Sequence, residues 1–355
     1  MAGRRNRAIV VAFGAIVSAL VLLEGIGRMA GRPPRIADAT FVNAPEWSYP
    51  DKIAKDPELF WSYHPRQVIR DNFFAPGIYS INSLGLRGPE PSEPKRADMH
   101  RVVCFGESTT FGWGVSDEIA YPRQLETELN RLDPDHGRWE VINAGVTNYS
   151  TFQGVALAQR WLPRWKPDIA LFHYSFADHQ PAGMGIPDNS LSMPPQWRLD
   201  VETTLLGSFA LQWARWAWLS VFRSEAPEGP ADRKVWRVGL PEFVSNIEKL
   251  VRAAQDAGAR PLIVTSPISW PPPGASDTTG VFNYHQRYRR MARYEAVATG
   301  AQFVELANAF DSHREFFDDR RVDNEHFNAA GHRFAATFLA QFILGTPPDT
   351  SDSRR

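Results

Sequence analysis

The chain has 355 residues, of which 43% are hydrophobic and 22% are charged, so it is long enough for one large folded domain or two ordinary ones. Its formal net charge is −1 and it contains no dense cluster of Lys and Arg, which argues against a nucleic-acid partner. Cys104 is the only cysteine, which excludes an internal disulfide and a cysteine-based metal site.

The amino terminus has the pattern of a targeting or anchoring segment. Several arginines precede an apolar run from Ala8 to Leu23, as in such segments. The run is slightly short for a membrane span, but flanking residues up to Met29 extend it. We predict that residues 1–30 form an uncleaved membrane anchor and that the rest of the chain lies outside the cytoplasm, in the periplasm or the extracellular space. Cleavage of the segment is the alternative.

Residues 31–99 are rich in proline, aromatic and polar residues without a sustained period, and we expect an extended lead-in packed against the main domain. After it, short apolar runs alternate with amphipathic stretches. The expected strands are Val102–Phe105, Trp139–Ala144, Asp168–Tyr174, Pro261–Thr265 and Gln302–Leu306. The expected helices are Pro122–Leu132, Gln153–Leu162, Pro241–Ala257, Tyr284–Thr299 and Asn328–Ile343. Gly258 and Gly300 stand where helix-ending glycines belong.

This alternation predicts an α/β domain over residues 100–345, with a parallel five-stranded sheet and helices on both faces. Ligands of such sheets lie beyond the carboxyl ends of the strands. Residues 346–355 are expected to form a disordered tail.

A stretch at about residues 180–237 interrupts the alternation and is rich in tryptophan, so we interpret it as an insertion. Its part from Leu211 to Phe222 has the pattern of a helix. Such a helix could cover a substrate site or lie on a membrane surface. The favoured interpretation is that its aromatic residues pack in the core of the protein.

A serine, an aspartate and a histidine stand where hydrolytic chemistry needs them. Ser108 follows the first expected strand of the domain, at the edge of the sheet where substrates bind. A serine hydroxyl needs a neighbouring base, and that base needs a group to orient it. Asp323 and His326, three residues apart just before the last helix, can share one face of a turn. We predict that these three residues form a catalytic triad.

Three motifs resemble blocks of the SGNH (GDSL-type) hydrolase family, and the resemblance extends over about Ile81 to Ile343. VVCFGESTTFGWGV is similar to the first block, VINAGVTNYSTFQG to the second and DNEHFNAAGH to the last. A further stretch, INSLGLRGPE, is similar to a lead-in of anchored extracytoplasmic members. The resemblance implies a flavodoxin-like three-layer sandwich and an esterase activity. It places Ser108, Asp323 and His326 in the triad positions.

The same resemblance implies an oxyanion hole, with one departure. The backbone N–H groups of Ser108 and Gly145 occupy donor positions of the family pattern. The third block, normally Gly-x-Asn-Asp, reads Ser-Phe-Ala-Asp here, with Ala177 in place of the asparagine. The side chain of Asn148 is the favoured substitute donor and His179 is the other candidate. Glu107 stands where aspartate is commoner in the family.

We therefore expect a serine ester hydrolase or acyl transferase that acts on O-acylated carbohydrate outside the cytoplasm and needs no cofactor and no metal. Its expected partners are an ester substrate, either a small molecule or a carbohydrate, and the membrane, through the N-terminal helix. One alternative is a lipid esterase. Another is a weakly active or inactive domain that binds a polysaccharide or an assembly partner.

Overall fold

The computed structural model describes residues 2–31, 33, 52–71, 77–222, 235–269, 281–311, 313–317 and 325–346. Asp323 and residues 347–355 of the predicted tail lie outside this part of the chain.

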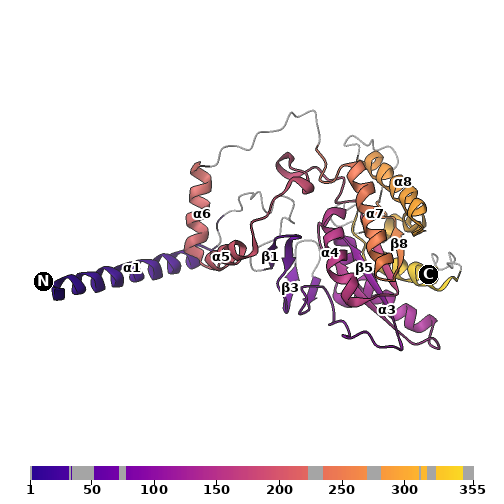
Figure 1. The fold of residues 1–355 in the computed structure, drawn as a ribbon, viewed down its shortest axis with the longest axis horizontal. Coiled ribbons are helices and arrows are strands. Elements are labelled where there is room, and N and C mark those ends of the chain that lie inside the picture. The colour runs from indigo at the N-terminus through magenta and orange to yellow at the C-terminus, as the bar shows by residue number, and fades with distance from the viewer. Residues whose placement is uncertain are drawn as a thin grey trace.

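A parallel sheet of five strands forms the centre of the α/β domain (Figure 1). The strands are β5 (Met99–Gly106), β6 (Arg138–Gly145), β7 (Ile169–His173), β8 (Arg260–Val264) and β9 (Gln302–Val304). Their order in the sheet is β6-β5-β7-β8-β9, so the first strand of the domain lies between the second and the third. This is the flavodoxin-like order, and it confirms the predicted fold.

Helices cover both faces of the sheet. One face carries α3 (Tyr121–Leu132), α9 (Leu306–Phe310) and α10 (Ala329–Leu344). The other carries α4 (Thr151–Trp165), α7 (Leu240–Asp256) and α8 (Val281–Thr299). Successive side chains of a strand point to opposite faces of the sheet. Because β5 is a continuous apolar run, both of its faces are apolar. Val103 and Phe105 enter one core, and Val102 and Cys104 enter the other. The strands and helices expected from sequence are confirmed, with ends shifted by a few residues.

Local sequence signals set the helix ends. Ser150 caps the start of helix α4 and forms a reciprocal capping box with Gln153. Gly258 and Gly300 have φ angles of +76° and +74°, in the left-handed region that favours glycine after a helix. Both were expected at helix ends. The short helices are α2 (Ser108–Phe111) and the 3₁₀ turns η2 (Asp117–Ile119), η3 (Gly183–Gly185), η4 (Asp188–Ser190) and η5 (Arg314–Phe316).

The described part of the lead-in contains two β-hairpins, which the sequence analysis did not predict. Strands β1 (Ile53–Asp56) and β2 (Phe60–Tyr63) pair antiparallel, as do β3 (Gln67–Asp71) and β4 (Gly77–Ile81). Arg87 then forms isolated bridges to Ile81 and to Asn143 of β6. The lead-in therefore extends the edge of the central sheet.

The insertion contains α5 (Gln196–Leu206) and α6 (Phe209–Phe222), which confirms the helix expected there. Trp197 and Trp218 are 69% and 62% exposed, so the expectation that the insertion's aromatic residues pack in a core is wrong for these two. A helix can present such side chains outward along one stripe, and tryptophan composition alone does not distinguish an exposed stripe from a buried one.

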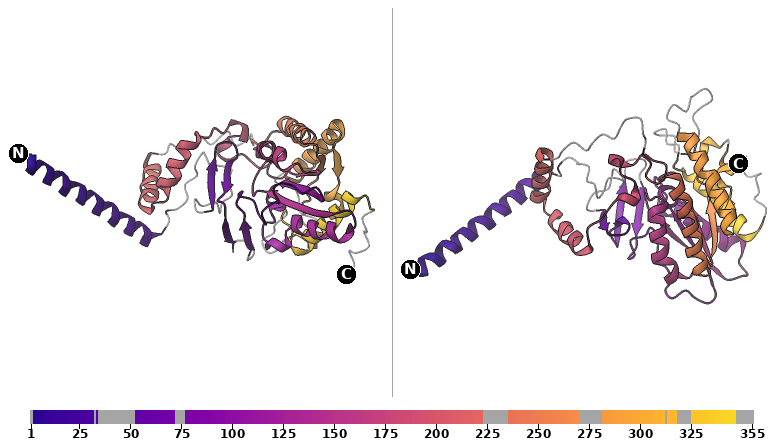
Figure 2. Two further views of the ribbon diagram at one scale, coloured as in Figure 1. Left: turned by 60° about the horizontal axis from the view of Figure 1, so that its bottom comes forward. Right: turned by 45° about the horizontal axis from the view of Figure 1, so that its top comes forward.

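Helix α1 (Ala2–Ala30) projects away from the α/β domain, and α6 lies against its carboxyl-terminal end (Figures 1 and 2). The indole Nε1 of Trp213 donates to the carbonyl of Gly31 at 2.9 Å, and the carboxylate of Glu24 accepts from the backbone N–H of Ala210 at 3.1 Å. Among the residues that the structure describes, no helix combines the length and the apolar character needed to cross a membrane.

Candidate active site

Two glycines at strand ends make room for the serine. Gly106 of β5 is paired in register with Gly145 of β6. A Cβ atom on Gly106 would lie 2.1 Å from Thr110 Oγ1, and one on Gly145 would lie 2.4 Å from the backbone nitrogen of Phe111. Helix α2 therefore lies directly on the two strand ends, and Ser108 is its first residue. As predicted, the serine stands at the carboxyl edge of the sheet.

The structure brings Ser108 and His326 together although 218 residues separate them in the sequence. Ser108 Oγ lies 2.8 Å from His326 Nε2, a distance suited to proton transfer. A bridge between Phe317 and Phe327 and the side chain of Asn328, which caps helix α10, hold the histidine in place. The structure thus places the serine and the histidine of the predicted triad within hydrogen-bond distance of each other.

Glu325 is a second acceptor beside the serine, and the sequence analysis did not identify it. Ser108 Oγ donates to Glu325 Oε1 at 3.1 Å. The serine has one hydroxyl proton, so Glu325 and His326 compete for it. The residue lies inside the last motif, between the two predicted triad members, but no local pattern indicated that its carboxylate turns towards the serine.

Glu107 connects the serine segment to the third motif. Its carboxylate is buried and accepts from the backbone N–H groups of Phe176 and Ala177, at 3.0 and 2.6 Å. Burial raises the pKa of Glu107 well above its usual value, and the nearby charges of Glu325 and Asp178 raise it further. The N–H of Ala177 is therefore used within the protein, and its side chain has no donor.

Asp178, the last residue of the third motif, organises the start of helix α4. Its carboxylate accepts from the backbone N–H of Thr151 at 3.0 Å and from the hydroxyl of the same residue. Burial raises the pKa of Asp178 to about 7, although these hydrogen bonds oppose the shift. This role is structural, because Asp178 holds α4 and not the reacting serine.

The candidate oxyanion donors differ in what they bind. The N–H of Gly145 donates to Asn143 Oδ1 at 3.0 Å, so it would have to leave this partner to bind an oxyanion. Asn148 is partly exposed and has a φ angle of +63°, a conformation that asparagine tolerates better than most residues. The carbonyl of Asn148 accepts from Arg237 Nη1 at 2.8 Å.

A buried ion pair at the base of the insertion supports the Asn148 loop. Arg237 Nη2 lies 2.9 Å from Asp188 Oδ2, and both side chains are almost fully buried. Asp188 also accepts from the hydroxyl of Ser150 at 2.7 Å. The two ends of the insertion therefore meet beside the site, and they hold the loop at the Asn148 carbonyl and at Ser150.

The N–H of His179 is used by another histidine, so His179 is not an oxyanion donor. Its Nε2 lies 2.9 Å from His285 Nδ1, and His285 Nε2 lies 2.8 Å from the carbonyl of Ser266. Because a carbonyl only accepts, His285 carries its proton on Nε2 and accepts from the Nε2–H of His179. Burial lowers the pKa of His179 to about 4, so this histidine is neutral near pH 7 and has no further N–H to offer.

Residues 104–334 match the GDSL-like Lipase/Acylhydrolase family. The match covers more than half of the chain, and the protein belongs to this family. It is accordingly an esterase of the GDSL type. The comparison with curated proteins finds no match.

Solved structures also share similarity with the chain. The lipase/acylhydrolase from Enterococcus faecalis is 16% identical and aligns with 71% of this chain and 99% of its own, with a TM-score of 0.44. Axe2, an acetylxylan esterase from Geobacillus stearothermophilus, is 16% identical and aligns with 69% of this chain and 93% of its own, with a TM-score of 0.43.

The oxyanion role predicted from sequence for the Asn148 side-chain amide implies a specific kinetic loss. Replacing Asn148 by Gly removes the side chain but keeps the left-handed backbone, whereas Ala would add strain. We expect Asn148→Gly to lower kcat by about 10²- to 10³-fold with little change in KM, because a donor to the transition state is lost. Steady-state ester hydrolysis measures both constants.

The complementary variant is Ala177→Asn, which introduces the amide of the family pattern. In the Asn148→Gly background it should recover part of the lost kcat. Wild-type kcat in Asn148→Gly would show that the amide is not a donor at this site.

Proposed function

We propose that the protein is a serine ester hydrolase or acyl transferase in which Ser108 is the nucleophile, His326 the general base and Asp323 the residue that orients the imidazole. The contact of 2.8 Å between Ser108 Oγ and His326 Nε2 carries the proposal. The spacing of Asp323 and His326 in the family motif supports the third role. The buried strand ends under Ser108 supply the rigid support that such a constellation needs.

The reaction has two half-reactions. In the first, Ser108 Oγ attacks the ester carbonyl while His326 Nε2 takes the hydroxyl proton. Backbone N–H groups at the strand ends and the Asn148 amide stabilise the oxyanion. The tetrahedral intermediate then expels the alcohol, which receives the proton from His326. In the second, water or another hydroxyl attacks the acyl-enzyme while His326 takes its proton. The acyl group then leaves Ser108 Oγ, which regains the proton from His326.

We propose O-acylated carbohydrate as the substrate class. The exposed tryptophans of the insertion support this choice, because flat aromatic faces are suited to stacking on sugar rings. The same side chains also suit an acyl chain, so a lipid ester is the nearest alternative. A panel of acetylated glycans, short-chain esters and long-chain lipid esters separates the two: a kcat/KM higher for lipid esters than for glycans would overturn the carbohydrate proposal.

A second candidate is a domain that binds polysaccharide or an assembly partner with little or no turnover. Two observations favour it: Ala177 offers no side-chain donor, and Glu325 competes with His326 for the serine proton. A fluorophosphonate reagent tests the choice, since it reacts only with an activated serine. Labelling supports the enzyme, whereas a folded protein that is not labelled but binds glycans supports the binding domain.

We further propose that α1 attaches the domain to a membrane, with the domain on the extracytoplasmic side. The apolar run from Ala8 to Leu23 and the arginines before it support this proposal. We expect the full-length protein to remain with the membrane fraction during alkaline extraction, and a chain that begins at about residue 36 to leave it. Release of the full-length protein by high salt alone would show that α1 is not inserted.

The triad predicts that single substitutions abolish turnover. We expect Ser108→Ala and His326→Ala each to lower kcat by about 10⁴-fold or more, with no additional loss in the double variant, because triad members act as a unit. Single-turnover acylation and thermal unfolding should be measured together. Near-normal acylation in either folded variant would contradict the assignment.

A further inference from the structure

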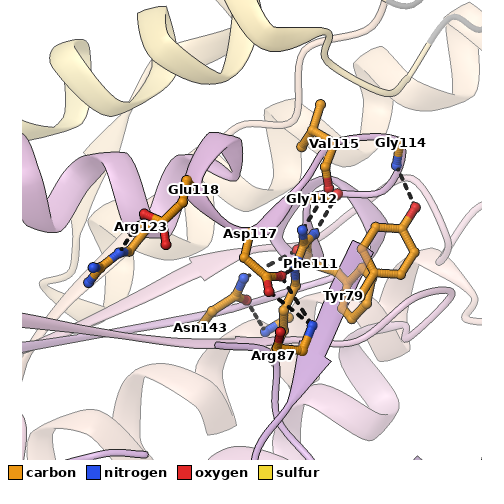
Figure 3. A network of polar contacts seen from close by, with 12 residues as sticks. Tyr79, Arg87, Phe111, Gly112, Gly114, Val115, Asp117, Glu118, Arg123 and Asn143 are labelled. Atoms are coloured by element: carbon orange, nitrogen blue, oxygen red, sulfur yellow. Dashed lines mark hydrogen bonds and ion pairs between the residues drawn. The ribbon is translucent and has the colours of Figure 1, made fainter. Parts of the chain in front are cut away.

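Arg87 lies in the lead-in after β4. Its guanidinium contacts residues 111–115, at the end of α2 and just after it (Figure 3). The side chain is fully buried. Its Nε donates to Asp117 Oδ1 at 2.8 Å. Its Nη1 donates to the carbonyls of Phe111 and Gly112, and its Nη2 to that of Val115, each at 2.6 Å. The guanidinium carbon also lies 4.6 Å from the centre of the Tyr79 ring.

The carbonyls that Arg87 binds belong to the turn that holds the serine. The N–H groups of Gly112 and Trp113 donate to the carbonyl of Ser108, at 2.9 and 3.0 Å. Gly112 has a φ angle of +87°, and a Cβ atom there would lie 2.7 Å from Arg87 Nη1. The guanidinium is therefore packed directly against the backbone that closes the Ser108 turn.

The same segment reaches the base. The ring of Trp113 lies against that of His326, with 6.4 Å between the ring centres. The hydroxyl of Tyr79, also from the lead-in, accepts from the N–H of Gly114 at 3.1 Å. Residues 111–115 thus touch both members of the Ser108–His326 pair, and side chains of the lead-in fix their backbone.

We propose that Arg87 is a positioning residue of the catalytic centre. By binding three carbonyls of residues 111–115 at once, its guanidinium holds Ser108 and Trp113 where His326 can take the serine proton. This inference rests on the proposed function. A lysine cannot replace the arginine, because an ammonium on a flexible stem lacks the planar fork that satisfies several carbonyls together. Carbonyls left without a donor in the interior are costly, so the segment would rearrange.

The molecule contains a matched control. Arg101, at the start of β5, is also fully buried, and it binds Glu140 Oε2 and the carbonyl of Trp165, both at 2.7 Å. It also donates to the carbonyl of Ser92 in the lead-in. Arg101 therefore joins the lead-in to the domain as Arg87 does, but at the opposite end of the strand from Ser108.

The experiment compares Arg87→Lys with Arg101→Lys at a temperature where both variants are folded. We expect Arg87→Lys to lower kcat and the rate of fluorophosphonate labelling by about 10²-fold with little change in KM, because small displacements of reacting groups cost this much. Arg101→Lys should lose stability but keep both rates. Equal losses in the two variants, or wild-type rates in Arg87→Lys, would overturn the proposal.

Two further measurements separate this proposal from the proposed function. The rate of amide hydrogen exchange over residues 111–115 should rise in Arg87→Lys and not in Arg101→Lys. This expectation holds whether or not the wild type reacts with fluorophosphonate. An unchanged exchange rate in Arg87→Lys overturns the positioning role. Failure of the wild type to label overturns the proposed function instead.

Chemical rescue by guanidinium ion distinguishes a local role of Arg87 from a general loss of stability. A cavity of about 480 Å³ has Arg87, Asp117 and Asn143 among its lining residues, so we expect removal of the Arg87 side chain to open the guanidinium position to this cavity. Guanidinium ion, far below denaturing concentrations, should raise the labelling rate of Arg87→Ala and not that of Arg101→Ala. Rescue of both variants or of neither, with Arg87→Ala folded, counts against the proposal.

Discussion

The close approach of helix α2 to the ends of β5 and β6 is the constraint on which the site depends. Gly106 and Gly145 lie side by side, and neither position has room for a Cβ atom. The nucleophile therefore rests on backbone and not on mobile side chains. The loops that carry Asn148 and Ala177 leave the same edge of the sheet, so parallel topology brings residues from distant parts of the sequence to one serine.

Two glutamate carboxyl groups lie close to this serine. Glu107 is buried against the backbone of the third motif, and Glu325 reaches the hydroxyl itself. In the mechanism proposed above, a carboxylate near Ser108 opposes the oxyanion but favours the positively charged imidazole that forms when His326 takes the proton. The same group therefore acts in opposite directions on the two charges that appear during acylation, and the hydrogen-bond donors must outweigh the unfavourable one.

The sequence predicted the parts of the molecule whose signals are local. The five strands and the main helices follow from apolar periodicity. The motifs at a strand end and a helix start singled out Ser108 and His326, which the structure places 2.8 Å apart, and their catalytic roles stay a prediction. Arg87, Glu325 and the Arg237–Asp188 pair escaped prediction because each acts on residues far away in the chain. The hairpins of the lead-in were missed because strands of four or five residues without regular alternation resemble irregular chain.

The buried pair of Arg237 and Asp188 has a consequence for how this architecture can change. It joins the two ends of the insertion beside the Asn148 loop, so the chain between them leaves and returns at one fixed point. We therefore expect changes of sequence or length between Asp188 and Arg237 to leave the Asn148 loop unaltered where the ion pair is kept. The ion pair would then separate variation within the insertion from variation in the Asn148 loop.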